Sequence, residues 1–205
     1  MSGTAGTPAL VVLQTRGIAH TVHSYEIVEP TGVEMHRGER AAYGPAAAAA
    51  LGIAPARLFK TLVLLLESGR PGGELVLAAL PSDAALSERA VAQAFGAKRA
   101  ALASVEQVQR ATGSVPGGVS PIAGRKVMRT LIDTSAEGLA TPFVSAGRRG
   151  LAVELAPADL LAACSGTYAS IFASRSMVTT LLERIVGSST NGDAHGRDSA
   201  HAYRM

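Results

Sequence analysis

Three segments of the sequence combine residue types that could bind an anion or polarise a carbonyl group. The first is Phe59-Lys60-Thr61-Leu62, in which a lysine interrupts an apolar run. An ammonium group there must reach a strand end or a cleft, because burial without a partner is costly or lowers its pKa. Lysine is scarce in this chain, where Lys60, Lys98 and Lys126 stand beside sixteen arginines. This scarcity strengthens the case for an anion or carbonyl contact, and a lysine whose stem merely covers a strand end is the alternative.

The second segment is the paired-glycine loop Gly117-Gly118-Val119-Ser120-Pro121. Two glycines let the backbone approach a ligand closely, and successive backbone N–H groups can form a concavity that holds an anion. Pro116 and Pro121 restrict both flanks of the loop. An ordinary tight turn has the same composition, so the segment by itself leaves both interpretations open.

The third segment, residues 144–151, contains Ser145, Gly147 and the adjacent Arg148 and Arg149. A serine hydroxyl could donate to a ligand, and the guanidinium groups could hold a phosphate. A solvent-exposed hairpin turn is the alternative.

Other catalytic signatures are absent from the sequence: it has no G-x-S-x-G, no phosphate-binding P-loop, no G-x-G-x-x-G after a strand and no H-E-x-x-H. His20 and His23 would face opposite sides of a strand, a spacing that is wrong for two metal ligands. Cys164 lies in an apolar helical context and is expected in the core, not as a nucleophile. We expect neither a metal nor a cofactor.

Composition limits the class of protein. A chain of 205 residues suits one domain with a tail, and 47% hydrophobic residues suffice for a core. With 4% aromatic residues and no tryptophan, nucleic-acid binding by aromatic stacking is disfavoured. No apolar run approaches the ~20 residues that a membrane span needs, and no signal peptide opens the chain. The single cysteine excludes an intrachain disulfide, and we expect a cytoplasmic protein.

The segments that could do chemistry must be positioned by alternating helices and strands. Apolar periodicity, prolines and capping residues predict helices over 7–16, 43–52, 87–95, 104–111 and 157–163. Strands are predicted over 18–25, 59–66, 74–80, 130–133, 141–145, 151–155 and 168–172. Short turns join several strands, which predicts an α/β (α+β) fold with a mixed, largely antiparallel sheet or a partly closed barrel.

Irregular structure is expected over 26–42 and 114–121. Residues 176–186 could form one amphipathic helix, and 187–205 have the composition of a disordered tail.

Taken in order, these pieces resemble the YbaK/EbsC-type aminoacyl-tRNA deacylases, free-standing relatives of the editing domain of bacterial prolyl-tRNA synthetases. The resemblance covers roughly residues 7–173 and is nearest to the Cys-tRNA(Pro) deacylase branch. The matching residues are Thr7-Pro8-Ala9, His23-Ser24-Tyr25-Glu26, Leu51-Gly52, Phe59-Lys60-Thr61-Leu62, Thr112-Gly113, Gly117-Gly118-Val119-Ser120-Pro121, Ile132-Asp133, Val144-Ser145-Ala146-Gly147-Arg148-Arg149-Gly150-Leu151 and Glu154-Leu155.

The resemblance implies an editing domain over residues 1–173, with 174–205 as a largely disordered tail. It implies a substrate, the 3′ aminoacyl-adenosine end of tRNA, and a partner, prolyl-tRNA synthetase. If the amino acid is cysteine, its own thiol is expected to attack the ester, so that no protein nucleophile is needed. The implied catalytic residues are Lys60, Gly117 and Gly118, and the implied substrate-binding residues are Tyr25, Tyr43, Ser120, Ser145, Gly147 and Arg148.

Two departures from the family pattern leave alternatives open. Residues 26–42 are longer than usual, and Ala152 stands where the cysteine branch usually has Asp. Editing of alanyl, seryl or threonyl-tRNA is therefore an alternative. A non-catalytic module that binds tRNA, a synthetase or a nucleotide is another.

Overall fold

The computed structural model describes residues 6–27, 43–67, 69 and 72–172. All five predicted helices are present among these residues, each eight residues long. They are α1 (Pro8–Thr15), α2 (Tyr43–Ala50), α3 (Glu88–Phe95), α4 (Val105–Thr112) and α5 (Pro157–Cys164), joined by the 3-10 helices η2 (Pro55–Arg57) and η3 (Thr134–Gly138). No helix in the described ranges has the length and apolar character needed to cross a membrane.

Local sequence sets where these helices begin and end. Thr7 caps α1, because its hydroxyl oxygen accepts a backbone N–H of the first turn, and Ser87 and Ser104 cap α3 and α4 in the same way. Gly96 and Gly113 end α3 and α4 in the left-handed conformation, at φ +66° and +75°. The helix boundaries predicted at these caps are confirmed.

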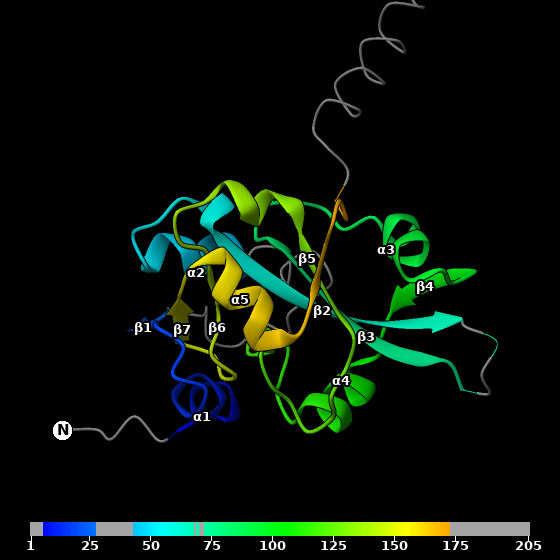
Figure 1. Ribbon diagram of the computed structural model, residues 1–205, viewed down its shortest axis with the longest axis horizontal. Coiled ribbons are helices and arrows are strands. Elements are labelled where there is room, and N and C mark those ends of the chain that lie inside the picture. Colours follow the sequence, from blue (N-terminus) through cyan, green and yellow to red (C-terminus); the bar gives the residue numbers. More distant parts are fainter. Residues whose placement is uncertain (1–5, 28–42, 68, 70–71, 173–205) are drawn as a thin grey trace, which may run out of the picture. The chain divides into compact units, whose positions relative to one another are not determined.

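The strands form one mixed sheet, in which four of the pairings between described strands are antiparallel and three are parallel. The strand order is β1-β7-β6-β2-β3-β5-β8, and β4 pairs with β2. The long β2–β3 hairpin lies at its centre (Figure 1). The strands are β1 (Thr21–Ser24), β2 (Leu58–Glu67), β3 (Glu74–Pro81), β4 (Arg99–Leu102), β5 (Thr130–Asp133), β6 (Phe143–Ser145), β7 (Leu151–Glu154) and β8 (Thr167–Ala169).

The structure corrects the predicted strands in two respects. Strand β4 was not expected, and β1 and β8 are shorter than the predicted segments 18–25 and 168–172. The predictions for residues 28–42 and for the tail after Phe172 lie outside the described residues.

Helices cover both faces of the sheet. Alternate side chains of β2 point to opposite faces, and the two sets pack against different helices. On one face, Phe59 packs in a cluster with α1 and α5, and Val63 packs with α4. On the other face, Leu58 packs with α2, and Leu64 packs with α3.

One edge of β2 is shared by two short strands that do not meet. Strand β6 pairs with Leu58 and Phe59, whereas β4 begins its pairing at Leu64. Residues 60–63 lie between them, and we call this stretch the β2 gap. Lys60, Thr61 and Leu62 are partly exposed there, although β2 is a central strand. Within the β2 gap these three residues are less buried than Phe59 and Val63 on either side of them.

Candidate active site

Lys60 is held by carbonyl groups of its own chain. Its Nζ donates to Ser82 O at 3.0 Å and to Ala84 O at 2.6 Å, just after the end of β3. Burial lowers the pKa of Lys60, and the charge of Asp83 offsets part of that effect. These acceptors belong to the protein itself, so a contact between Lys60 and a ligand anion or carbonyl stays a prediction. An ammonium group has three N–H donors, and these bonds use two of them.

The paired-glycine loop lies against Tyr43 and the arginine turn. Gly117 has φ +86°, and a Cβ atom there would lie 3.0 Å from Tyr43 Cε1 and 3.3 Å from Arg149 Nε. At Gly118 a Cβ atom would lie 3.0 Å from the backbone nitrogen of Arg149. Both positions need glycine because there is no room for a side chain. The Gly118 N–H donates to Val115 O at 2.9 Å, so it closes the turn and faces inward.

The N-terminus of α2 joins the lysine to this loop. Tyr43 contacts the loop at Gly117, whereas a Cβ atom on the next residue, Gly44, would lie 2.8 Å from the Cβ atom of Ser82. Ser82 is the residue whose carbonyl oxygen accepts from Lys60. The N-terminus of α2 therefore adjoins both the residue that supports Lys60 and the Gly117 loop, although Lys60 and the loop lie on opposite faces of β2.

A pocket of about 310 Å³ opens beside this junction, lined by Glu26, Ile27, Tyr43, Arg149 and Gly150. The guanidinium carbon of Arg149 lies 5.4 Å from the centre of the Tyr43 ring, and Arg149 Nε donates to Pro116 O at 2.9 Å. Arg149 therefore fixes the tyrosine ring and the glycine loop together.

Tyr25 interacts with two of the residues that line the pocket, Gly150 and Tyr43. Its backbone N–H donates to Gly150 O at 3.0 Å. The pKa of its hydroxyl is raised, chiefly by burial and further by the adjacent, hydrogen-bonded Tyr43. Tyr25 thus stays neutral and can act as a hydrogen-bonding wall of the pocket.

The structure brings Arg149, not Arg148, to the pocket. Arg148 is exposed on the turn between β6 and β7, whereas Arg149 is half-buried against Tyr43. Sequence reasoning named both arginines as possible phosphate contacts and then selected Arg148 alone for the substrate site, because nothing local distinguishes two adjacent arginines.

The remaining predicted polar residues shape turns. The Ser120 hydroxyl oxygen accepts from the N–H of Ile122 at 3.2 Å, and that of Ser145 accepts from the N–H of Gly147 at 3.3 Å. The carbonyl oxygen of Gly147 in turn accepts from the Ser114 hydroxyl at 3.1 Å. The first two bonds shape their own turns, and the Ser114–Gly147 bond joins the segment before the glycine loop to the arginine turn. Substrate binding by Ser120, Ser145 and Gly147 stays a prediction.

Ala152 forms part of the apolar wall near the tyrosines. It is fully buried, pairs across the sheet with His23 and Ser145, and belongs to the cluster that includes Tyr25 and Tyr43. The methyl group of Ala152 therefore offers the tyrosine cluster an apolar contact and no charge.

Thr61 has an unusual environment beside Lys60. Its Oγ1 is the one buried side-chain oxygen or nitrogen without a hydrogen-bond partner in the described part of the chain. Its side chain shares a face with Phe59 and Val63, which pack in the clusters containing Ile122 and Val119. An unpaired buried hydroxyl group costs free energy, and here it lies next to the glycine loop.

Cys164 is a core residue, as expected. It is 9% exposed, and burial raises the pKa of its thiol to about 11. A thiol in that state is a poor nucleophile at neutral pH.

A second polar cluster was missed by sequence reasoning. Glu154 accepts from Arg57 at 3.0 Å and from the hydroxyl of Thr141, and its other oxygen lies 3.0 Å from His23 Nε2. These residues come from β7, η2, β1 and the segment before β6, so no short motif connects them. The cluster joins the edge strands to the start of β2.

Comparison with known proteins identifies relatives of this arrangement. A family model described as the aminoacyl-tRNA editing domain matches residues 39–163. A curated protein of Enterococcus faecalis, named "Putative Cys-tRNA(Pro)/Cys-tRNA(Cys) deacylase EbsC", is 35% identical over 124 residues. That alignment covers 60% of this chain and 73% of the relative.

Solved structures share the fold at lower identity. The structure titled as a putative trans-editing enzyme for prolyl tRNA synthetase has a TM-score of 0.64 and 21% identity, and covers 82% of this chain and 99% of its own. The hypothetical protein APE2540 has a TM-score of 0.63 and 23% identity, with 78% and 96% covered. The mixed fold with packed helices is thus a known one.

Proposed function

This chain belongs to the aminoacyl-tRNA editing domain family, and from that premise we propose that it removes a mischarged amino acid from tRNA in trans, with cysteine on tRNA(Pro) as its first substrate. The EbsC relative carries that substrate in its name. We place the reaction at the junction of Lys60, the Gly117 loop and the pocket beside Tyr43.

A single observation carries the assignment of the site. The N-terminus of α2 touches the Gly117 loop through Tyr43 and the Lys60 support through Gly44 and Ser82. The lysine and the glycine loop, which are far apart in sequence, are therefore both linked to the N-terminus of α2, and Tyr43 of that helix lines a pocket together with Arg149.

The chemistry needs no nucleophile from the protein when the amino acid is cysteine. The substrate thiol attacks its own ester carbonyl, a C–S bond forms, and the C–O bond to the ribose breaks. The thiol proton passes to the departing ribose oxygen, which leaves tRNA with a free hydroxyl and a cysteine thiolactone. The protein then has to orient the ester and stabilise the negative charge on the carbonyl oxygen.

The geometry divides these tasks among three groups. The N–H groups of Gly117 and Val119 are the candidate donors to the carbonyl oxygen, since the Gly118 N–H is used within the turn. The third N–H of Lys60 is the candidate contact to the ribose or the ester. Arg149 is placed to hold the terminal phosphate.

The methyl side chain of Ala152 suggests a second candidate substrate, a tRNA that carries a small uncharged amino acid. An apolar wall beside Tyr25 and Tyr43 suits a small side chain without a charge-assisted contact to the protein. Alanine, serine and threonine meet this description, and a synthetase pocket alone discriminates poorly among amino acids of similar size. Prolyl-tRNA synthetase is the proposed protein partner because tRNA(Pro) is the first proposed substrate.

The test is a panel of mischarged tRNAs incubated with wild-type protein, Lys60→Ala and Cys164→Ala. We expect release of cysteine, or of one other small amino acid, by the wild type and by Cys164→Ala. For Lys60→Ala we expect at least a ~100-fold loss of rate, in the range seen when a transition-state donor is removed. Near-normal turnover by folded Lys60→Ala would place the site elsewhere.

The same panel separates the enzyme from a binding module. If the wild type binds tRNA but releases none of the amino acids, the chain is a non-catalytic module. An inactive but folded Cys164→Ala would contradict chemistry without a protein nucleophile.

A further inference from the structure

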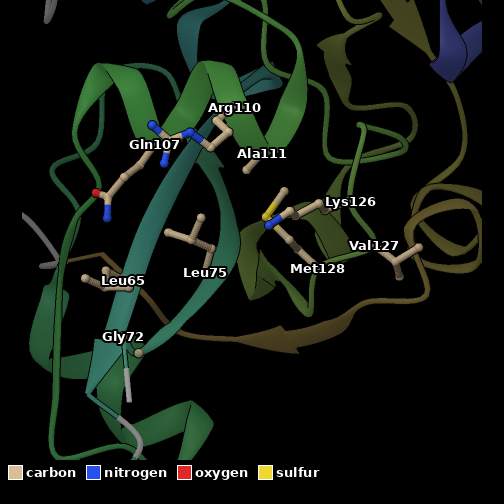
Figure 2. Close-up of a pocket in the computed structure, with 10 residues that line it drawn as sticks. Leu65, Gly72, Leu75, Gln107, Arg110, Ala111, Lys126, Val127 and Met128 are labelled. Carbon is tan, nitrogen blue, oxygen red and sulfur yellow. The ribbon is translucent and has the colours of Figure 1, made fainter. Parts of the chain in front are cut away.

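A second cavity lies away from the proposed active site, between the β2–β3 hairpin and α4. It has a volume of about 310 Å³ and is lined by Gly72 and Gly73 just before β3, by one side of α4 and by residues 126–128. Figure 2 shows Gln107, Arg110 and Lys126 around a floor that contains Leu65 and Leu75. We call this cavity the basic groove.

The charged residues that line the basic groove are both positive. Arg110 and Lys126 line it, and none of the lining residues is acidic. Neither side chain makes an ion pair or a hydrogen bond with any other described residue. The nearby Arg129 differs, because Glu74 binds its guanidinium through two bonds of 2.8 and 2.9 Å. The groove therefore presents two cations to solvent, ready for an anionic ligand.

Glu106 is the carboxylate that interacts with Arg110. Its pKa is lowered mainly by a hydrogen bond from Ser104, and the charge of Arg110 contributes least. Glu106 is fully exposed and does not line the groove. Glu106 therefore adds no negative charge to the groove lining, which keeps the positive charges of Arg110 and Lys126.

The chain that lines the basic groove continues within a few residues into the loop of the proposed active site. Ala111 lines the groove, and Gly117 follows six residues later, a distance of at most ~20 Å along an extended chain. Arg125 lies on this path, since a Cβ atom at Gly113 would be 2.9 Å from its Nε. Stacked nucleotides rise about 3.4 Å each, so ~20 Å corresponds to roughly six nucleotides. The groove can thus reach the acceptor end of a tRNA whose terminal adenosine occupies the Gly117 loop.

We infer that the basic groove binds the phosphate backbone of the tRNA acceptor end, with Arg110 and Lys126 on phosphates and the Gln107 amide in reach of ribose hydroxyls. The inference rests on the proposed function for the identity of the RNA. Contacts to phosphate and ribose fix position without reading sequence. The groove therefore adds affinity for RNA and leaves the choice of amino acid to the pocket beside Tyr43.

The test compares Arg110→Gln/Lys126→Gln with the matched control Arg89→Gln/Lys98→Gln. The control removes the same charge from exposed residues outside the groove. Binding is measured by fluorescence anisotropy with an uncharged acceptor-stem minihelix that ends in CCA, at several salt concentrations. Deacylation is measured on the aminoacylated minihelix and on aminoacyl-adenosine, which lacks the upstream phosphates.

We expect the groove variant to bind the minihelix about 25-fold more weakly at 0.1 M salt, because each lost single-strand phosphate contact costs about fivefold there. Its salt slope should fall by about 1.4. The kcat/KM for the aminoacylated minihelix should fall in parallel, while that for aminoacyl-adenosine stays unchanged. The control variant should match the wild type in all three measurements.

The outcomes separate this inference from the proposed function. Weaker minihelix binding with no deacylation by the wild type would overturn the function and support the groove. Unchanged binding, a loss equal to that of the control, or an equal loss on aminoacyl-adenosine would overturn the groove. A loss seen only when a synthetase is added would also overturn it, because the occupant would then be an acidic protein segment.

Discussion

At the scale of single residues, Gly117 is the position where one added carbon atom should matter most. Its φ of +86° disfavours a side chain, and a methyl group would lie 3.0 Å from Tyr43. We expect Gly117→Ala to lose at least ~100-fold in deacylation, a loss similar to that of one oxyanion donor. Its stability should fall by the ~1–2 kcal/mol of a left-handed alanine plus the cost of displacing the Tyr43 ring, as measured by urea unfolding.

Gly96→Ala is the matched control for this variant. Gly96 also has a left-handed φ, +66°, but a Cβ atom there meets nothing within 4 Å. It should lose only the ~1–2 kcal/mol of a left-handed alanine and keep full activity. Equal activity in the two variants would mean that the Gly117 loop does not contact the ester.

Single residues also mark where sequence reasoning stops. Lys60 could be selected because a lysine inside an apolar strand needs a partner, and the structure supplies one. The choice between Arg148 and Arg149 depends on how the turn at Gly147 and Gly150 rotates each side chain. That rotation is set by contacts with residues far away in the chain, such as Pro116.

At the scale of elements, the Glu154 cluster joins strands that are distant in sequence. Hydrogen bonding from Thr141, then from His23, and the Arg57 charge lower the pKa of Glu154. A carboxyl whose pKa is lower in the folded state stabilises the protein above its unfolded pKa, near 4.3, and loses that effect as the pH falls through the folded value. We expect Glu154→Gln to lower the free energy of unfolding by about 1 kcal/mol at pH 7, measured by urea titration.

The difference between wild type and Glu154→Gln should shrink as the pH falls below 4. Glu137→Gln removes an exposed carboxylate outside the cluster and should have little effect at either pH. A Glu154→Gln difference that is constant across pH would show that the charge of Glu154 is unimportant.

Elements were predictable where their signals are local. The β2–β3 hairpin has two apolar runs around a glycine-containing turn, and α3 and α4 have serine caps and terminal glycines. Strand β4 has the sequence Arg-Ala-Ala-Leu, which carries no strand signal because alanine disfavours strands. It is a strand because it pairs with residues 64–67 of β2, a tertiary contact that its own sequence does not encode.

At the scale of the whole molecule, the residues of the proposed site come from both faces of one sheet. Lys60 points to the face covered by α2 and α3, and Val119 packs on the face covered by α4. The parallel pairings β2–β6, β3–β5 and β5–β8 connect distant segments, so strand order could not be read from local patterns. The presence of a mixed sheet could be predicted, because short turns and longer helical connections alternate along the chain.

The end of the chain should be separable from this assembly. Residues 187–205 contain few apolar side chains, so they gain little by packing against the cost of ordering, ~1–2 kcal/mol per residue. We propose that the editing domain ends near residue 173, and that truncation after Gly187 leaves both the melting temperature and minihelix deacylation unchanged. A truncated protein that unfolds at a lower temperature would assign the tail a structural role.

The β2 gap has a consequence for the exchange of backbone hydrogens with solvent. Val63 O accepts from the β4 side, so the Thr61 N–H, two residues earlier, points toward the same edge, where no described strand lies beside it. Thr61 should therefore have a rapidly deuterating amide within a strand whose neighbouring amides are slow. If substrate fills the β2 gap, the Thr61 amide should become protected from exchange. The deuteration rate of this one amide would then show whether substrate is bound.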